Sequence, residues 1–335
     1  MQPLFLVICY NMYNWTNLRD IVNEFIDKLE FEHEPRELYA PVRYTLEQSG
    51  KRVRPVLFLL AYNMYKEDVE LALPTALGVE TYHNYTLLHD DVMDRAEVRR
   101  GKPCVHKVWN ENTAILSGDS MLVMAYQLVA QCPEHCLKHV MDLFTDTALE
   151  IGEGQQYDVD FENRMDVRPE EYIEMIRLKT SVLLACALKL GAIQAGAPQA
   201  DADLLYKFGE SIGLAFQLQD DMLDVYGDFE TFGKRIGGDI LCNKKTYLLI
   251  KALEGANQQQ RAELEHWLTV SEFDADEKIA AVKALYDEIG VRAICQDLVN
   301  AYFEQGRLLL EKVALPSEKK EILWQYALSL LGRES

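Results

Sequence analysis

Apolar residues recur at spacings of three and four positions along almost the whole chain. The pattern is clear in LRDIVNEFIDKLEF from residue 18, MLVMAYQLVAQ from residue 121 and EILWQYALSLLG from residue 321. This period places the apolar side chains on one face of a helix. No stretch alternates well enough to predict a strand. The pattern therefore predicts an all-α protein of roughly a dozen helices, with prolines mostly at helix starts.

The helical pattern runs on without a Gly/Ser linker, a low-complexity tract or an internal repeat. With 335 residues, 49% of them hydrophobic, the chain can bury a large core. We therefore expect one domain over residues 16–335. The periodicity becomes convincing only at about Thr16, so residues 1–15 are expected to be an N-terminal extension. Met12 is a candidate natural start.

The charge and cysteine content exclude several classes of partner. A formal net charge of -20 would repel nucleic acids and anionic lipids. Seven cysteines, an odd number, do not suggest a disulfide framework and fit a reducing cytoplasm. The opening MQPLFLVICYNMYNW has too short an apolar run for a membrane span and no basic region for a signal peptide. We expect a cytoplasmic protein with no membrane span and no nucleic-acid partner.

Two acidic clusters share the same spacing at the ends of amphipathic helices. They are Asp90, Asp91 and Asp94, and Asp220, Asp221 and Asp224. Carboxylates four residues apart lie on one helix face and repel each other, so each trio opposes folding unless a cation neutralises it. A solvated helix end would explain one such trio but explains two much less well. Ligands that offer only oxygen suit Mg²⁺, which keeps positions for water and phosphate.

Basic clusters occur against this acidic background. GKRVRP and RRGKP each contain three basic residues, which are Lys51, Arg52 and Arg54, and Arg99, Arg100 and Lys102. Three further lysines lie singly near polar turns: Lys179, Lys234 and Lys244. Chance surface pairing would explain each of them alone. Together they predict two anion sites, one bridged to the acids through Mg²⁺ and one bound directly by Lys and Arg.

These motifs resemble the trans-isoprenyl diphosphate synthases, the polyprenyl synthetase family, and its short-chain farnesyl and geranylgeranyl members in particular. The similarity runs from about Glu37 to the last helix, and its motifs occur in the family's order: GKRVRP, ETYHNYTLLHDDVMDRAEVRRGKP, GEGQQYD, LKT, FQLQDDMLD, GKRIGGD and NKKT. The resemblance implies an all-α bundle of the isoprenoid-synthase type around a central apolar cavity. It also implies a homodimer.

The activity that the resemblance implies is the Mg²⁺-dependent head-to-tail (1′-4) condensation of isopentenyl diphosphate with dimethylallyl, geranyl or farnesyl diphosphate. The reaction proceeds by ionisation, condensation and elimination and gives an all-trans product. Three Mg²⁺ ions are expected with the allylic substrate bound, and Mn²⁺ is expected to substitute. The departing pyrophosphate is expected to take the proton, which makes His83 a diphosphate donor and not a general base.

Site roles follow from the resemblance, position by position. The Mg²⁺ ligands for the allylic diphosphate are Asp90, Asp91, Asp94 and Asp220, with Asp221 and Asp224 completing the second motif. Direct contacts to that diphosphate match Arg99, Lys179, Gln217 and Lys234. The isopentenyl diphosphate site matches Lys51, Arg54, His83 and Arg100. Polar groups beside the developing cation match Thr180 and Gln155, and Lys244 matches a basic residue near the second motif. Whether Asp224 ligates Mg²⁺ directly stays open. The C-terminal LLGRES offers only one basic residue, Arg333, which gives little support for a contact between the tail and isopentenyl diphosphate.

Product length is expected to depend on side chains below the first acids. The family's limiting positions fall on Tyr85 and Thr86, five and four residues before Asp90. Tyr85 lies about 7.5 Å and Tyr82 about 12 Å along the helix axis from Asp90. Helix angles place Thr86 and Tyr82 nearer the Asp90 face than Tyr85, and simple core packing would also explain both rings. Bulky rings favour a short product of fifteen or twenty carbons, and C20 is favoured over C15 because only one of the two limiting positions is aromatic.

Several alternatives stay open from the sequence. A class I terpene cyclase shares the first motif but needs no isopentenyl site, and a longer-chain polyprenyl diphosphate synthase differs only in its cavity. An HD-type phosphohydrolase, suggested by His89, would need further histidine ligands for its metals at suitable points along the chain. A catalytically silent partner subunit would be expected to lose acids from at least one of the two motifs, and this chain has lost none.

One further stretch has the residue types of a metal site. CPEHCLKH places Cys132, His135, Cys136 and His139 at helical spacing. A single helix cannot wrap four ligands around zinc, so we expect a helix start after Pro133 instead.

Overall fold

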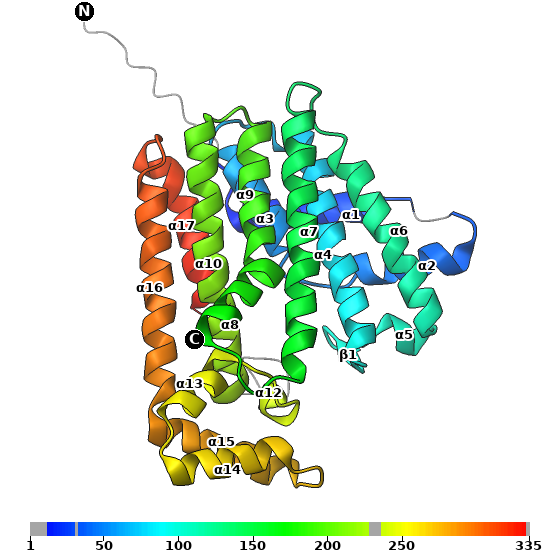
Figure 1. The fold of residues 1–335 in the computed structure, drawn as a ribbon. Helices are drawn as coiled ribbons and strands as arrows, with labels where there is room; N and C mark the ends of the chain where they lie inside the picture. The colour runs from blue at the N-terminus through cyan, green and yellow to red at the C-terminus, as the bar shows by residue number, and fades with distance from the viewer. Residues whose placement is uncertain (1–11, 31–32, 228–235, 333–335) are drawn as a thin grey trace, which may run out of the picture. The chain divides into compact units, whose positions relative to one another are not determined.

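The computed structural model of this chain describes residues 12–30, 33–227 and 236–332 (Figure 1). Apart from one short hairpin, its regular structure is helical, so the all-α prediction is confirmed. The helices are more numerous than the dozen expected. The chain divides into two compact units, each built from three chain segments. The domain boundaries at 1–15 and 16–335 stay predictions.

The first unit takes in the described residues of Met1–Thr145 together with Cys186–Leu205 and Val313–Leu323. Its elements are α1 (Trp15–Asp27), α2 (Arg36–Leu46), α3 (Val53–Asn63), η1 (Val69–Ala72), α4 (Leu73–Met93), α5 (Val105–Val108) and α6 (Glu111–Val129). Helix α4 packs against α6, α3 and α2. Its apolar residues occur on nearly every side, which is the pattern of a buried helix.

A hairpin that the sequence did not predict follows α4. Its strands β1 (Val98–Arg99) and β2 (Lys102–Pro103) pair antiparallel. The two turn residues, Arg100 and Gly101, have φ of 53° and 75°. Positive φ at both positions is typical of a type I′ turn, which matches the twist of a hairpin. Two-residue strands are too short to show alternation, so the pattern could not reveal them.

The second unit comprises Asp146–Ala185, Tyr206–Lys312 and the described part of Trp324–Ser335. Four helices have residues in both units: α7 (Leu137–Glu162), α9 (Val182–Gln194), α10 (Gln199–Tyr226) and α17 (Ser317–Leu331). The other elements are α8 (Pro169–Ile176), η2 (Arg177–Ser181), α12 (Gly238–Leu241), α13 (Tyr247–Gly255), α14 (Gln258–Thr269), α15 (Ala275–Ile289) and α16 (Val291–Glu311).

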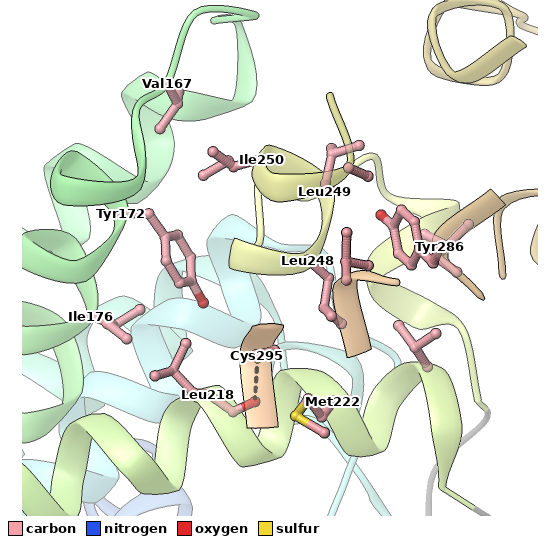
Figure 2. Packing of buried hydrophobic residues seen from close by; sticks show 14 of the residues in the cluster. Val167, Tyr172, Ile176, Leu218, Met222, Leu248, Leu249, Ile250, Tyr286 and Cys295 are labelled. Carbon is pink, nitrogen blue, oxygen red and sulfur yellow. Dashed lines mark hydrogen bonds between the residues drawn. The ribbon is translucent and has the colours of Figure 1, made fainter. Parts of the chain in front are cut away.

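The apolar core of the second unit surrounds the C-terminal part of α10. Leu218 and Met222 of α10 belong to one buried cluster with Tyr172, Leu248 and Cys295 (Figure 2). The Cys295 thiol donates to the Leu218 carbonyl at 3.9 Å. The core therefore holds the helix end that carries the second acidic trio.

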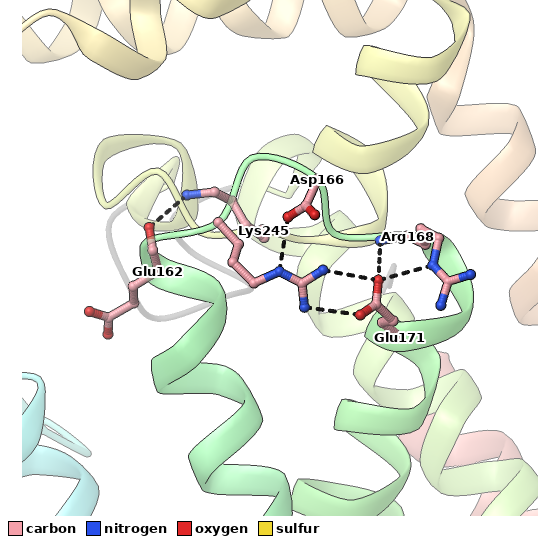
Figure 3. Close-up of polar contacts among 6 residues, drawn as sticks. Glu162, Asp166, Arg168, Glu171 and Lys245 are labelled. Carbon is pink, nitrogen blue, oxygen red and sulfur yellow. Dashed lines mark hydrogen bonds and ion pairs between the residues drawn. The ribbon is translucent and has the colours of Figure 1, made fainter.

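Polar contacts hold the connection between α7 and α8 (Figure 3). The guanidinium of Arg164 donates to both oxygens of Glu171, at 2.9 and 3.3 Å, and to Asp166 at 2.9 Å. These hydrogen bonds lower the pKa of Glu171 to about 2. The Lys245 ammonium donates to the Glu162 carbonyl at the end of α7, at 3.1 Å. This contact ties α7 to the segment that carries Lys244.

We predict that Gly191→Ala destabilises the protein, because a β-carbon on Gly191 would lie 2.1 Å from the Phe58 carbonyl oxygen of α3. The expected loss in free energy of unfolding is about 3 kcal/mol, from overpacking. Gly152→Ala in α7 is the control, because its β-carbon would meet nothing within 4 Å. That change should gain up to about 1 kcal/mol from helix propensity. Urea unfolding of both variants measures the difference, and equal stabilities would refute the close approach.

Candidate active site

The first acidic trio lies at the C-terminal end of α4. Asp94 caps the helix, and its amide donates to the Asp90 carbonyl at 2.8 Å. Asp91 is buried, and one of its oxygens accepts two hydrogen bonds from Arg99, at 2.9 and 2.6 Å. Asp90 is half-buried and Asp94 is exposed. The trio thus combines one carboxylate that is paired with an arginine and two carboxylates nearer the surface.

The second trio lies at the same end of α10. Asp221 is 2% exposed and accepts hydrogen bonds from the Tyr172 hydroxyl and from the Gln217 amide, the latter at 3.0 Å. Burial, and then the nearby Asp239 carboxylate, raise the pKa of Asp221. Asp224 is also buried and accepts from the Asp239 amide at 2.9 Å, and Asp220 is half-buried.

Both trios oppose the helix dipole. The C-terminal end of a helix carries partial negative charge, so carboxylates there are unfavourable even without their mutual repulsion. A divalent cation would offset both effects. Within the described ranges, no three His, Cys, Asp or Glu side chains already form a metal-holding group. Carboxylates, which offer only oxygen, fit Mg²⁺, an ion that proteins usually hold through one or two carboxylates together with substrate phosphates.

A cluster of arginines surrounds His83 in α4. Burial and four neighbouring guanidinium groups hold the pKa of His83 well below its usual value; they belong to Arg54, Arg100, Arg99 and Arg52. An uncharged imidazole among so many cations indicates a place where an anion would be favoured. The structure thus brings together three of the residues expected to bind isopentenyl diphosphate: Arg54, His83 and Arg100. Lys51, the fourth, is exposed.

Arg52 has a different role from its basic neighbours. Its side chain turns inward, pairs with Glu80 at 3.2 Å and donates to the carbonyls of Leu46 and Gln48 at 2.7 and 3.0 Å. The residue is 5% exposed. Because its donors are used inside the fold, Arg52 holds the start of α3 in place.

Arg100 is positioned through residues that the sequence reasoning missed. It donates to the Asn84 side-chain oxygen at 3.2 Å, and the Asn84 amide donates to the Glu80 carboxylate at 3.2 Å. A β-carbon on Gly50 would lie 3.3 Å from the Arg100 guanidinium carbon. Glu80 and Asn84 lie one helical turn apart within the motif ETYHN, but this spacing does not reveal that Arg100, 16 residues further on, contacts Asn84.

Lys179 lies in the π-helical turn η2. Its ammonium donates to Asp158 at 2.6 Å. Although burial opposes the shift, Lys179 and Lys244 lower the pKa of Asp158. The turn has close glycine neighbours: β-carbons on Gly154 and Gly213 would lie 2.3 Å from the Lys179 amide and 2.7 Å from the Ser181 α-carbon. π-Turns occur often at functional sites. Asp158 ends the motif GEGQQYD and was missed.

The other expected contacts of the second unit are placed as follows. The Thr180 hydroxyl donates to the Gln217 side-chain oxygen at 3.2 Å, so these two are brought together with Asp221. Gln155 is half-buried on α7 next to Gly154, and Lys244 follows α12. Lys234 and Arg333 lie outside the described residues.

The expected chain-length residues belong to an aromatic cluster of the first unit. The Tyr82 ring lies 5.4 Å from both the Tyr85 and the Phe144 rings, and Phe144 lies 5.0 Å from Tyr126, measured between centroids. Tyr82 is 3% exposed. The Thr86 hydroxyl donates to the His83 carbonyl at 2.8 Å. Core packing explains Tyr82 well, so its role in product length stays a prediction.

His89 joins α4 to α6. One of its ring nitrogens lies 3.1 Å from the Ile115 carbonyl oxygen, and a β-carbon on Gly118 would lie 2.2 Å from that same nitrogen. His89 therefore packs between α4 and α6.

The stretch CPEHCLKH contains the expected helix start after Pro133. Helix α7 begins at Leu137, and Cys132 and Cys136 are buried in the turn before it. The Cys136 thiol donates to the Pro133 carbonyl at 3.2 Å, a contact that stabilises the turn.

Comparison with known proteins identifies the family. Residues 35–289 match the family described as polyprenyl synthetase. The chain belongs to the polyprenyl synthetase family. The resemblance inferred from the motifs is therefore confirmed.

Two relatives and one solved structure illustrate how far this family likeness extends. The chain is 38% identical to the geranylgeranyl diphosphate synthase of Methanosarcina mazei over 316 residues, 93% of this chain and 95% of the relative. It is 36% identical to the geranylfarnesyl diphosphate synthase of Natronomonas pharaonis over 326 residues, 88% and 94% of the two chains. A crystal structure of geranylgeranyl pyrophosphate synthase is similar with a TM-score of 0.92 and 43% identity, covering 97% of this chain and 100% of that one.

We predict that His83 makes the stability of this family member sensitive to acid. Its pKa is lowered in the folded state, so the unfolded chain takes up a proton near pH 6.5 that the folded protein refuses. Stability is therefore lost as the pH falls below about 6.5, by up to about 1.4 kcal/mol per pH unit. His83→Gln should lose this part of the slope, measured by urea unfolding between about pH 7.5 and 5. His135→Gln, at an exposed position, is the control, and equal slopes for His83→Gln and wild type would contradict the prediction.

Proposed function

We propose that the protein catalyses the Mg²⁺-dependent head-to-tail (1′-4) condensation of isopentenyl diphosphate with an allylic diphosphate. The prediction of a trans-prenyltransferase is confirmed by its family and by its named relatives. The observation that carries the finer proposal is that one chain combines two acidic trios with a separate arginine cluster around His83. This combination suits two anionic substrates with different modes of binding.

The aspartate trios are proposed to serve the allylic diphosphate. Mg²⁺, when held by these carboxylates, would offset the negative charge that builds on the leaving diphosphate. Arg99 lies 2.6 Å from Asp91 of the first trio, and Lys179 lies 2.6 Å from Asp158 of the motif GEGQQYD. Both are proposed to donate to oxygens of the allylic diphosphate. Lys234 and Lys244 are proposed to add further positive charge.

The carbon chemistry needs positioned polar groups and no protein nucleophile. When the allylic C–O bond breaks, its electron pair leaves with pyrophosphate, and the isopentenyl double bond attacks the resulting cation. Thr180 and Gln155 are proposed to face that cation. Gln217, whose side-chain oxygen accepts from the Thr180 hydroxyl at 3.2 Å, is proposed to contact the allylic diphosphate. The departing pyrophosphate takes the proton that is lost on elimination.

The His83 cluster is proposed to hold isopentenyl diphosphate. Arg54 and Arg100 supply fixed charge, Lys51 adds a flexible ammonium, and the His83 ring supplies one neutral N–H donor. A general base would need a pKa nearer neutrality than the lowered value of His83. A terpene cyclase would have no use for this second anion site, so the cluster favours the synthase over that alternative.

Three finer properties complete the proposal. A C20 product is supported by the bulky rings below Asp90, a homodimer by the family resemblance, and a cytoplasmic location by the odd cysteine count. None of the described helices combines the length and the apolar character that a membrane crossing requires.

Product analysis tests the proposed reaction directly. Purified protein is incubated with Mg²⁺, isopentenyl diphosphate and each allylic diphosphate, and pyrophosphate release and product chain length are measured. We expect a C20 prenyl diphosphate and loss of turnover with excess EDTA. Asp90→Asn should lower kcat by about 10²–10³. Asp142→Asn, in an exposed surface ion pair with Lys138, is the matched control and should be unaffected.

Two outcomes would contradict the proposed reaction. Wild-type protein that releases no pyrophosphate with any primer would exclude the synthase activity. Conversion of an allylic diphosphate without isopentenyl diphosphate would indicate the cyclase instead.

We predict that Tyr85→Ala lengthens the product, because it removes a ring that lies between Tyr82 and His89. At least one further five-carbon unit is expected, detected by mass spectrometry of the dephosphorylated alcohols. Tyr157→Ala, an exposed tyrosine of α7, is the control and should leave the length unchanged. An unaltered product from Tyr85→Ala would remove Tyr85 from the proposed role.

A further inference from the structure

Lys278 in α15 is a buried cation whose position needs a reason. The residue is 1% exposed, although lysine is rarely buried unless it is paired. Its ammonium donates to the Asn243 side-chain oxygen at 2.7 Å and lies 4.3 Å from the centre of the Phe273 ring. Burial lowers the pKa of Lys278. The hydrogen bond to the amide oxygen and the contact with the aromatic ring thus offset part of the free-energy cost of burying this amine.

Asn243 is the residue directly before Lys244, and it has an unusual backbone. Its φ of 54° places it in the left-handed region. Its side-chain amide donates to the Leu268 carbonyl at 3.2 Å, and its own carbonyl accepts from the Lys245 ammonium at 3.1 Å. The Asn243 side chain is therefore held from two sides, by Lys278 and by the C-terminal end of α14.

The other end of this segment is held by the neighbour of Lys278. Gly237 also has a left-handed backbone, with φ of 84°, and a β-carbon there would lie 2.6 Å from the Ile279 side chain. The Gly237 amide donates to the Asp224 carbonyl at 2.6 Å. Adjacent residues of α15 thus contact both ends of the stretch 237–243, which connects the second acidic trio to Lys244.

Charged residues within and just after this segment shift the pKa values of carboxyl groups in the candidate active site. Asp239, within it, raises the pKa of Asp221, and Lys244, just after it, lowers the pKa of Asp158. A shift of the Asn243 backbone would move the Lys244 ammonium relative to both carboxylates. Misplacing a binding group by about 1 Å can cost up to about 10²-fold in rate.

We propose that Lys278 is a positioning residue that acts through Asn243 to fix Lys244 for diphosphate binding. The inference rests on the proposed function, in which Lys244 contributes charge to the allylic diphosphate. Lys278 and Asn243 line one pocket together with Trp267, Val282 and Tyr286, and within it the Lys278 ammonium donates to the Asn243 oxygen. A residue of similar shape without the amine would leave the Asn243 oxygen unpaired there.

The central test is Lys278→Met, which keeps the shape of the side chain and removes the donor. Calorimetry with inorganic pyrophosphate and Mg²⁺ measures anion affinity without turnover, and steady-state kinetics give KM for each substrate. We expect pyrophosphate affinity to fall and allylic KM to rise by about tenfold, with KM for isopentenyl diphosphate unchanged. Lys283→Met is the matched control: this lysine of α15 lies over the Tyr226 ring at 5.3 Å and should behave as wild type.

Asn243→Gly provides the second variant, because glycine accepts the left-handed backbone but lacks the acceptor oxygen. It should show at least the same loss, because it also removes the hydrogen bond to the Leu268 carbonyl. Adding Lys278→Met to Asn243→Gly should lose nothing more, since the contact that the two residues share is already broken. A lowered Tm with unchanged pyrophosphate affinity would reduce Lys278 to core packing and overturn the proposal. Equal rises in KM for both substrates would also overturn it. If Lys278→Met does not fold, Asn243→Gly decides alone, and unchanged affinity refutes the role.

Failure of the proposed function and failure of the positioning role of Lys278 give different experimental results. Wild-type protein that binds pyrophosphate with Mg²⁺ but forms no prenyl product would reject the proposed function. The pyrophosphate comparison between wild type and Lys278→Met would still report on positioning.

Discussion

Repulsion between carboxylates at the negative ends of two helices is the constraint on which the rest of this structure depends. Helices α4 and α10 each end in three aspartates, where both the neighbouring charges and the helix dipole disfavour them. The fold relieves part of this cost with specific donors: Arg99 at Asp91, and Tyr172 and Gln217 at Asp221. The remaining cost makes each trio a place where a divalent cation would be favoured.

The supporting groups come from elements that have little sequence signal of their own. Arg99 lies on a two-residue strand, Lys179 on a π-turn, and Asp239 on a four-residue helix. Larger neighbours fix the stretch that carries Asp239 and the end of helix α10. The buried core around Leu218 holds the end of α10, and the α15 residues Lys278 and Ile279 hold the stretch that includes Asp239. Long helices thus form the bulk of the fold, and short irregular elements position the charged side chains.

The sequence predicted well what depends on period and spacing. The helical fold followed from apolar residues three and four apart, and the two trios followed from their repeated i,i+4 arrangement. It could not predict contacts that depend on how distant segments meet. Arg52 is grouped in sequence with substrate-binding candidates, yet its guanidinium binds Glu80 and two carbonyls inside the fold. Asp158 and Lys278 were missed because their partners lie 21 and 35 positions away.

The neutral imidazole among the arginines has a thermodynamic consequence. Burial, and then the surrounding guanidinium groups, lower the pKa of His83. An anion bound between Arg54 and Arg100 would offset the second of these effects, so ligand association would be linked to proton uptake from the solvent. Near neutral pH, the heat of association would therefore include the ionisation heat of whatever buffer supplies that proton. The cluster couples the acidity of its surroundings to the occupancy of the site.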